Sequence, residues 1–116
     1  MANSCRIDLF VYTNDKGLVF YLIGGSTLSH KDSVRVAGSA NLIYRGSVGH
    51  TTAGMPEIAK FTLKLDESPD IPEISAWLCE KLQGRTEKLL IGGKPVLLNR
   101  DTIAQVIGKH ARVHEA

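Results

Sequence analysis

The sequence predicts an α+β protein: a mostly antiparallel sheet, with an N-terminal hairpin and meander, covered on one face by two helices. The first observation is the stretch at residues 57–65, which ends in AKFTLKL, where apolar and polar side chains alternate. A period of two puts successive side chains on opposite faces of a strand, so one face is dry and the other meets water. The second observation is the capped, amphipathic stretch at residues 70–84, because such a helix covers the dry face of a sheet.

The N-terminal hairpin is expected from two runs, residues 5–12 and 18–23, that are rich in β-branched and aromatic side chains. Residues 13–17 (TNDKG) lie between them and favour a turn. In the first strand we expect the face of Ile7 to be the core face.

The meander continues through short strands at residues 34–36 and 41–44, with residues 38–39 turning the chain between them. Residues 46–56 form the longest irregular segment and lead into the strand at 57–65. Together with the hairpin, this makes about five strands in the first half of the chain, a usual size for a sheet.

The first helix is expected to begin at Asp70 or Ile71. Asp70 and Glu73 have the spacing of a capping box, and Pro72 is tolerated in a first helical turn. Gly84 then ends the helix at the usual position. One apolar stripe follows helical spacing, with Trp77 at its border. Its members are Ile71, Ile74, Leu78 and Leu82.

A second hairpin is expected where residues 88–91 and 95–98 flank residues 92–94 (GGK). A second helix starts between residues 99 and 102, with its inward face formed by Ile103, Val106 and Ile107. Gly108 is expected to end it. The whole chain, 1–116, is then one domain, in which residues 109–116 fray.

Self-association as a homodimer is expected at the second hairpin. Pro95 suits an edge strand, and an unpaired edge needs a partner or protection. The interface candidates are Trp77, Leu90 and Val96. An acidic segment (66–80) and a basic segment (81–112) also allow complementary contacts.

Composition limits the environment and the partners. The net charge of +2 is too small to argue for nucleic acid or a membrane surface. Cys5 and Cys79 are the only cysteines, too few for a disulfide framework. The N-terminus does not resemble a signal peptide, and no apolar run is long enough to span a bilayer. We expect a soluble protein of the reducing cytoplasm.

A nucleic-acid partner is unlikely on the sequence. Lys60 and Lys64 line one strand face, and Phe10, Tyr12 and Tyr21 could line a sheet surface. Basic residues mixed with aromatic residues can stack bases. No run matches the RNA-recognition consensus, however, and such aromatic residues are more often core residues or cross-strand pairs.

The candidate acid–base group is His50, in the long segment 46–56, with Thr51 or Thr52 as proton donor or nucleophile. No acidic partner is identified by spacing. The simpler interpretation is a surface connection with glycines at its turns.

Two further motifs are weak. The run Gly24, Gly25, Ser26 and Thr27 can expose backbone N–H groups to an anion, but it lacks the P-loop lysine. His110 and His114 have the i, i+4 spacing of zinc ligands without a convincing third ligand, so no metal is expected.

The sequence is therefore interpreted as a non-catalytic binding protein that acts through a protein surface or a small-ligand pocket, without a cofactor. The alternative is a small enzyme that uses the 46–56 segment with His50 as its acid or base. A perturbed pKa of His50 inside a concave pocket would favour the enzyme, whereas a large, flat apolar patch would favour the binding protein.

Overall fold

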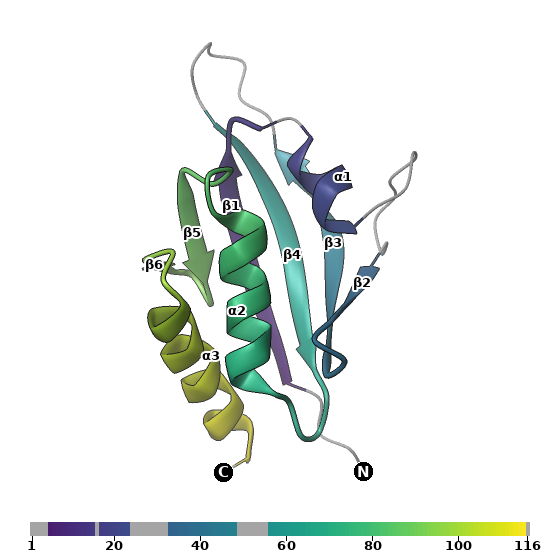
Figure 1. Cartoon of the computed structure of the whole chain (residues 1–116), viewed down its shortest axis with the longest axis vertical. Coiled ribbons are helices and arrows are strands. Elements are labelled where there is room, and N and C mark those ends of the chain that lie inside the picture. The colour runs from purple at the N-terminus through teal and green to yellow at the C-terminus, as the bar shows by residue number, and fades with distance from the viewer. Residues whose placement is uncertain (1–4, 16, 24–32, 49–55, 116) are drawn as a thin grey trace.

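The computed structural model of the protein describes residues 5–15, 17–23, 33–48 and 56–115. Within these residues six strands form one antiparallel sheet in the order β2-β3-β4-β1-β5-β6, and three helices accompany it (Figure 1). The strands are β1 (Cys5–Thr13), β2 (Ser33–Val36), β3 (Ala40–Val48), β4 (Glu57–Leu65), β5 (Lys88–Ile91) and β6 (Lys94–Val96). The helices are α1 (Leu18–Ile23), α2 (Ile71–Leu82) and α3 (Arg100–Glu115).

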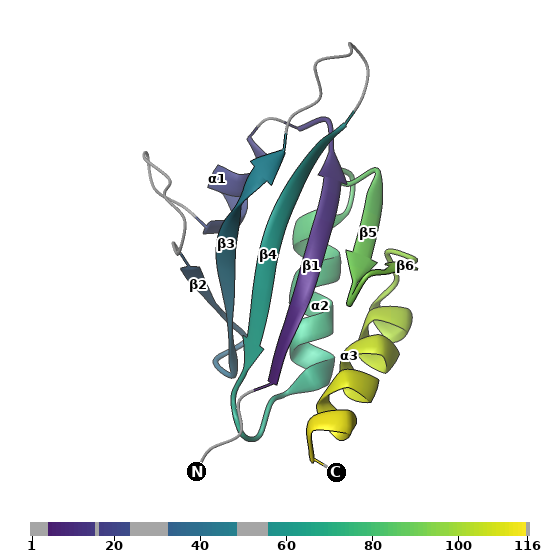
Figure 2. The same ribbon diagram turned by 180° about the vertical axis from the view of Figure 1, so that it is seen from behind.

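All three of these helices lie on the same side of the sheet. Figure 1 shows them in front of the strands, with α2 crossing β1, and Figure 2 shows the strands from the side without helices. The α+β class, the antiparallel sheet and the helical cover on one face are therefore confirmed, with α1 as an unexpected third helix. None of the described helices is long and apolar enough to cross a membrane.

Strand β1 lies at the centre of the sheet, between β4 and β5. Ile7 is opposite Leu63, and Leu9 lies between Phe61 of β4 and Ile91 of β5. All five side chains are buried, so the face of Ile7 is the core face, as expected.

The hydrophobic core lies between this face and the helices. From α2 it receives Ile74, Leu78 and Leu82, none more than 1% exposed. From α3 it receives Ile103 and Ile107, both fully buried. The helical stripes read from the sequence are thus the faces that cover the sheet.

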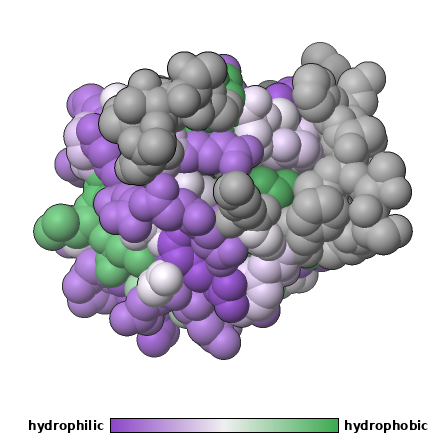
Figure 3. Space-filling view, turned by 90° about the horizontal axis from the view of Figure 1, so that it is seen from above, coloured by the Kyte–Doolittle hydropathy of each residue, from purple (hydrophilic) through white to green (hydrophobic). Residues whose placement is uncertain are grey.

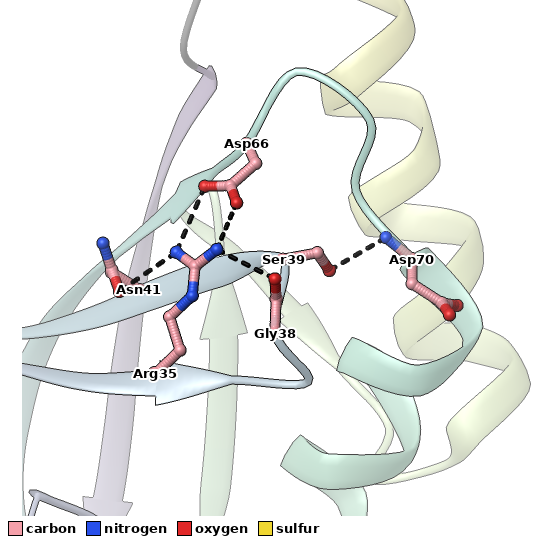
Figure 4. Close-up of polar contacts among 6 residues, drawn as sticks. All are labelled: Arg35, Gly38, Ser39, Asn41, Asp66 and Asp70. Atoms are coloured by element: carbon pink, nitrogen blue, oxygen red, sulfur yellow. Dashed lines mark hydrogen bonds and ion pairs between the residues drawn. The ribbon is translucent and has the colours of Figure 1, made fainter.

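The start of α2 is fixed by hydrogen bonds within and beyond the helix. The Asp70 carboxylate accepts from the backbone N–H of Glu73, at 3.2 Å, as the capping pattern predicts. The backbone N–H of Asp70 donates to Oγ of Ser39 at 2.9 Å, which ties the helix to the turn between β2 and β3 (Figure 4). Gly84 follows the helix with φ of 78°, as expected for its end.

The expected N-terminal hairpin is wrong, because residues 18–23 form α1. The Asp15 carboxylate accepts from the backbone N–H of Gly17 at 2.9 Å, in a local turn that leads into the helix. The residues of α1 that pack into the core follow helical spacing: Leu18, Val19 and Leu22. Both sides of β1 are already paired, with β4 and β5, so a hairpin partner has no place beside it.

The segment expected to be irregular, 46–56, is partly strand. β3 continues to Val48 after its register shifts between Tyr44 and Ser47. Gly46 lies in this irregularity with φ of 103°, a conformation that glycine adopts without strain. Residues 49–55 lie outside the described residues.

Helix α3 runs past Gly108 to Glu115, so the expectation that this glycine ends the helix is wrong. A glycine inside a helix costs about 1 kcal/mol relative to alanine. The buried side chains on either side, Ile107 and Ala111, offset that cost by packing into the core. Fraying of the last turns stays a prediction.

The second hairpin is confirmed, as β5 and β6. Gly92 and Gly93 turn the chain with φ of 62° and 84°, conformations that favour glycine. Pro95 lies in β6, the last strand in the order, where no neighbour needs its missing N–H.

Candidate binding surface

Two of the sites expected from the sequence fall outside the described residues. They are the anion-cradle candidate Gly24, Gly25, Ser26 and Thr27, and the acid–base candidate His50 with Thr51 and Thr52. Both stay predictions from the sequence.

The three interface candidates lie on different surfaces. Trp77 is half-buried on α2 and packs against the core from the helix side. Leu90 pairs with Phe10, on the side of the sheet without helices, whereas Val96 pairs with the buried Leu89. One contact patch therefore cannot contain all three.

Apolar side chains gather at the edge formed by β5 and β6. Figure 3 shows a green area at the left, the side on which Figure 1 places these strands. Leu97, just after β6, is 76% exposed. Leu89, Val96 and Leu98 help to line a hollow of about 300 Å³ beside it. β6 pairs with β5 alone within the described sheet, so its other side is an edge, from which Pro95 removes one N–H donor.

His110 belongs to the packing of α3 against the β5–β6 turn. A Cβ added to Gly92 would collide with the His110 imidazole. The His110 carbonyl accepts a hydrogen bond from Sγ of Cys5 at 3.7 Å, and burial raises the pKa of that thiol. Within the described residues no group of three or more His, Cys, Asp or Glu could hold a metal ion, and the side chain of His114 lies outside them.

The polar side chains at the lower end of the sheet form hydrogen bonds and an ion pair with other groups of the protein (Figure 4). Arg35 of β2 reaches across β3 to form an ion pair with Asp66, and donates to the carbonyl of Gly38 at 2.8 Å. The hydrogen bond from Arg35 holds the pKa of Asp66 below its ordinary value. This guanidinium joins the β2–β3 turn to the end of β4 and has little capacity left for a ligand.

Tyr21 lies on α1 and not on a sheet surface beside Phe10 and Tyr12. The Arg85 guanidinium lies 4.0 Å from its ring centroid and forms an ion pair with Asp15 at 2.7 Å. The hydrogen bond from Arg85 lowers the pKa of Asp15. This contact joins α1 to the end of α2, so Tyr21 does not join the aromatic residues of β1.

The most unusual surface is the side of the sheet that faces away from the helices, which we call the open sheet face. No helix of the described part of the chain lies on it (Figure 2). Cross-strand pairs between β1 and β4 form its centre, and β5 extends it. The central pairs are Arg6–Lys64, Asp8–Thr62, Phe10–Lys60 and Tyr12–Ile58. On the β5 side Phe10 pairs with Leu90, and Tyr12 with Lys88.

Cations greatly outnumber anions on this face. Among the described residues on β1, β3, β4 and β5, one carboxylate of the face is present, that of Asp8. The cations are Arg6, Arg45, Lys60, Lys64 and Lys88. Arg6 and Lys64 lie directly opposite each other, an arrangement of like charges that destabilises a sheet.

Two aromatic rings lie among these cations. Phe10 and Tyr12 are both half-buried, and they are two residues apart on β1. The Lys60 ammonium lies 5.9 Å from the Phe10 ring centroid, and the Lys88 ammonium lies 5.5 Å from that of Tyr12. Each ring is thus paired with a cation that a neighbouring strand supplies.

Thr62 anchors the centre of the open sheet face. It is 5% exposed, although it points away from the core, and its Oγ1 accepts from Nε of Arg45 at 3.1 Å. This hydrogen bond holds the guanidinium over the face. Within the described part of the chain, the two Nη groups of Arg45 form no hydrogen bond.

The alternation within each strand predicts which side chains share a side of that strand, but not which strands lie next to each other. It placed Arg6, Asp8, Phe10 and Tyr12 on one side of their strand, and Lys60, Thr62 and Lys64 on one side of theirs. The pairing of β1 with β4 and β5 was needed to bring these sets together. No local signal in the sequence specifies that pairing.

Comparisons of the chain with models of known protein families, with curated proteins and with solved structures gave no match.

Proposed function

We propose that the protein is a non-catalytic binding protein whose partner docks on the open sheet face. The excess of cations on this face carries the proposal, and it favours a partner that is acidic. Complementary charge speeds the encounter of two molecules and selects between partners. The net charge of +2 does not report this, because it averages over the whole chain.

Folding alone does not require this distribution of charge. The core lies on the other side of the sheet, so opposite charges facing each other on the open sheet face would serve stability better than Arg6 opposite Lys64. A bound anion would relieve that repulsion. The half-buried Phe10 and Tyr12 add apolar area that a partner can cover.

A surface suits the described residues better than a small-ligand pocket. The hollow between β6 and α3 has a volume of about 310 Å³, at the lower end of the roughly 300–1,000 Å³ range of small-molecule sites, and the cationic Lys94 and Lys109 help to line it. A larger hollow of about 670 Å³ lies beside Ser39 and Asp66, but Leu65 is the one described residue with an apolar side chain in its lining. Small-molecule sites are lined mainly by apolar and aromatic side chains.

A homodimer is part of the proposal, with β6 as the contact. The exposed Leu97 and the apolar side chains beside it support the proposal, although Pro95 removes one hydrogen-bond donor from the edge. A dimer formed through this edge would leave the open sheet face of each copy available. The free thiols of Cys5 and Cys79 fit the proposed location in a reducing cytoplasm.

The alternative of a small enzyme depends on His50 and the residues beside it. Because residues 49–55 lie outside the described residues, no geometry supports an acid–base role, and the enzyme stays a prediction from the sequence.

The proposal is tested by capture of partners from a native lysate with three forms of the protein. The first is the wild type, and the second carries Lys60→Glu and Lys64→Glu on the open sheet face. The control carries Lys81→Glu and Lys109→Glu on the helix side, which changes the net charge by the same amount. Retained proteins are identified by mass spectrometry, and retained nucleic acid by staining with and without nuclease.

The expected result is an identified species that the wild type and the control retain and the open-face variant loses. Equal retention by all three forms would contradict the proposal, because the surface would then not contribute to binding. Circular dichroism must show that each variant is folded.

A further inference from the structure

We propose that the partner of the open sheet face is a single-stranded nucleic acid. This inference rests on the proposed function and names the chemistry of its partner. It follows from the combination of rings, cations and one unpaired carboxylate on the same face.

The rings are placed to stack bases. Phe10 and Tyr12 project from the same side of β1 two residues apart, which separates them by about 7 Å along the strand. That distance lets each ring receive a different base. Aromatic side chains on an open sheet bind bases in this way because every base presents a π-face.

The cations are placed to follow a phosphate backbone beside those bases. Lys60 and Lys88 lie on opposite flanks of β1, each next to one ring. Arg6 and Lys64 continue the charge toward the lower end of the face. A negatively charged chain can therefore run along the sheet while its bases turn toward β1.

Arg45 adds a group with the right geometry for phosphate. Its Nε is fixed by Thr62 at 3.1 Å, and its Nη groups have no hydrogen-bond partner within the described residues. A guanidinium fork held in place matches two oxygens of a phosphate and loses little freedom on binding.

Asp8 adds a hydrogen-bond acceptor among the cations of the face. Its exposed carboxylate has no ion pair within the described part of the chain. The exocyclic amino group of a base can donate a hydrogen bond to it, while the phosphates contact the cations around it.

The same features favour a single strand over a duplex. Bases stacked inside a duplex are not available to rings on a sheet, and the described part of this face presents no helix for a major groove. Binding should therefore be strongest where bases are unpaired.

The test measures fluorescence anisotropy of labelled oligonucleotides of about 12 nucleotides, a length within the usual site sizes. Single-stranded RNA, single-stranded DNA and a duplex are titrated with the full chain at about 50 mM and about 200 mM salt. Both single strands are expected to bind more tightly than the duplex, and more weakly at the higher salt.

Two sets of variants distinguish the contribution of base stacking to the affinity from the contribution of phosphate contacts. Tyr12→Ala should weaken binding by roughly 5- to 150-fold, the usual effect of losing one stacked base, whereas Tyr12→Phe should keep most of the affinity. Lys60→Ala with Lys64→Ala should lower the slope of log affinity against log salt by about 1.4, since each phosphate contact contributes about 0.7 on a single strand. Lys109→Ala, on the helix side, should change neither quantity.

Failure of this inference can be told apart from failure of the proposed function. If no oligonucleotide binds, or the duplex binds best, or the variants at Tyr12, Lys60 and Lys64 bind like the wild type, the inference is wrong. If the variant with Lys60→Glu and Lys64→Glu nevertheless fails to retain an identified protein that the wild type retains from the lysate, the proposed function stands with a protein as the partner. If neither assay depends on the face, both are wrong.

Discussion

Replacing Leu78 with alanine should be among the most destabilising single truncations in the chain. Leu78 is fully buried in the middle of α2, between Ile74 and Leu82, which are also buried. Leu→Ala changes in cores cost about 2–5 kcal/mol, and the cost rises with the size of the cavity that remains. Because α2 packs against the sheet and alongside α3, little can collapse into the space, so we expect about 3–5 kcal/mol.

The measurement is urea unfolding followed by circular dichroism. With a slope of about 1–3 kcal/mol per molar urea, the midpoint should fall by about 1–5 M. Leu97→Ala is the matched control, because it removes the same atoms from a side chain that is 76% exposed. That variant should stay within about 0.5 kcal/mol of the wild type.

Equal midpoints for the two variants would refute the placement of Leu78 in the core between α2 and the sheet. A loss at Leu78 below about 1 kcal/mol would have the same meaning, because it would place this side chain in water.

Three further predictions concern other parts of the molecule. Arg35 lowers the pKa of Asp66, so this pair stabilises the fold above the ordinary carboxyl pKa of 3.8 and ceases to do so as the pH falls through the lowered value. Asp66→Asn should therefore flatten the acid limb of a plot of urea midpoint against pH, and an unchanged limb would contradict the pairing. Gly92→Ala should cost more than about 1 kcal/mol in the same assay, because φ is 62° and the new Cβ would collide with His110; wild-type stability would refute that packing. Light scattering coupled to size exclusion should give twice 12.6 kDa for the proposed dimer and a lower mass for Leu97→Asp, whereas a wild-type mass near 12.6 kDa at high micromolar concentration would exclude it.

The elements that the sequence predicts well are those with a long local pattern. Strand β4 contains seven residues of alternation, 59–65, and its observed bounds, Glu57–Leu65, are the expected ones. Helix α2 has a capping side chain at Asp70, a proline in its first turn and Gly84 after its end. Each of these signals acts within a few residues, so neither element depends on the rest of the fold for its identity.

The mistaken strand at residues 18–23 shows where local pattern is insufficient. A run of six apolar residues is compatible with a buried strand and with a short helix. Residues 18–23 form a helix because β1 already pairs with β4 on one side and with β5 on the other, which leaves no free edge for a third strand. Those partners come from residues 57–65 and 88–91, and the sequence contains no signal that ranks them above the nearer run.

The open sheet face depends on the same distant pairing, so the net charge of the whole chain does not describe the charge of this surface. With all described helices on one side, the two sides of the sheet differ in composition, and the net charge adds the charges of both sides together. Other carboxylates lie elsewhere, with Glu73 and Glu80 on α2 and Asp15 in an ion pair with Arg85. Cations on β1, β3, β4 and β5 meet on one face because the strands pair in this register. A one-residue slip of β4 would turn Lys60 and Lys64 toward the core, which burial forbids, so the packing that stabilises the fold also holds the cationic face together.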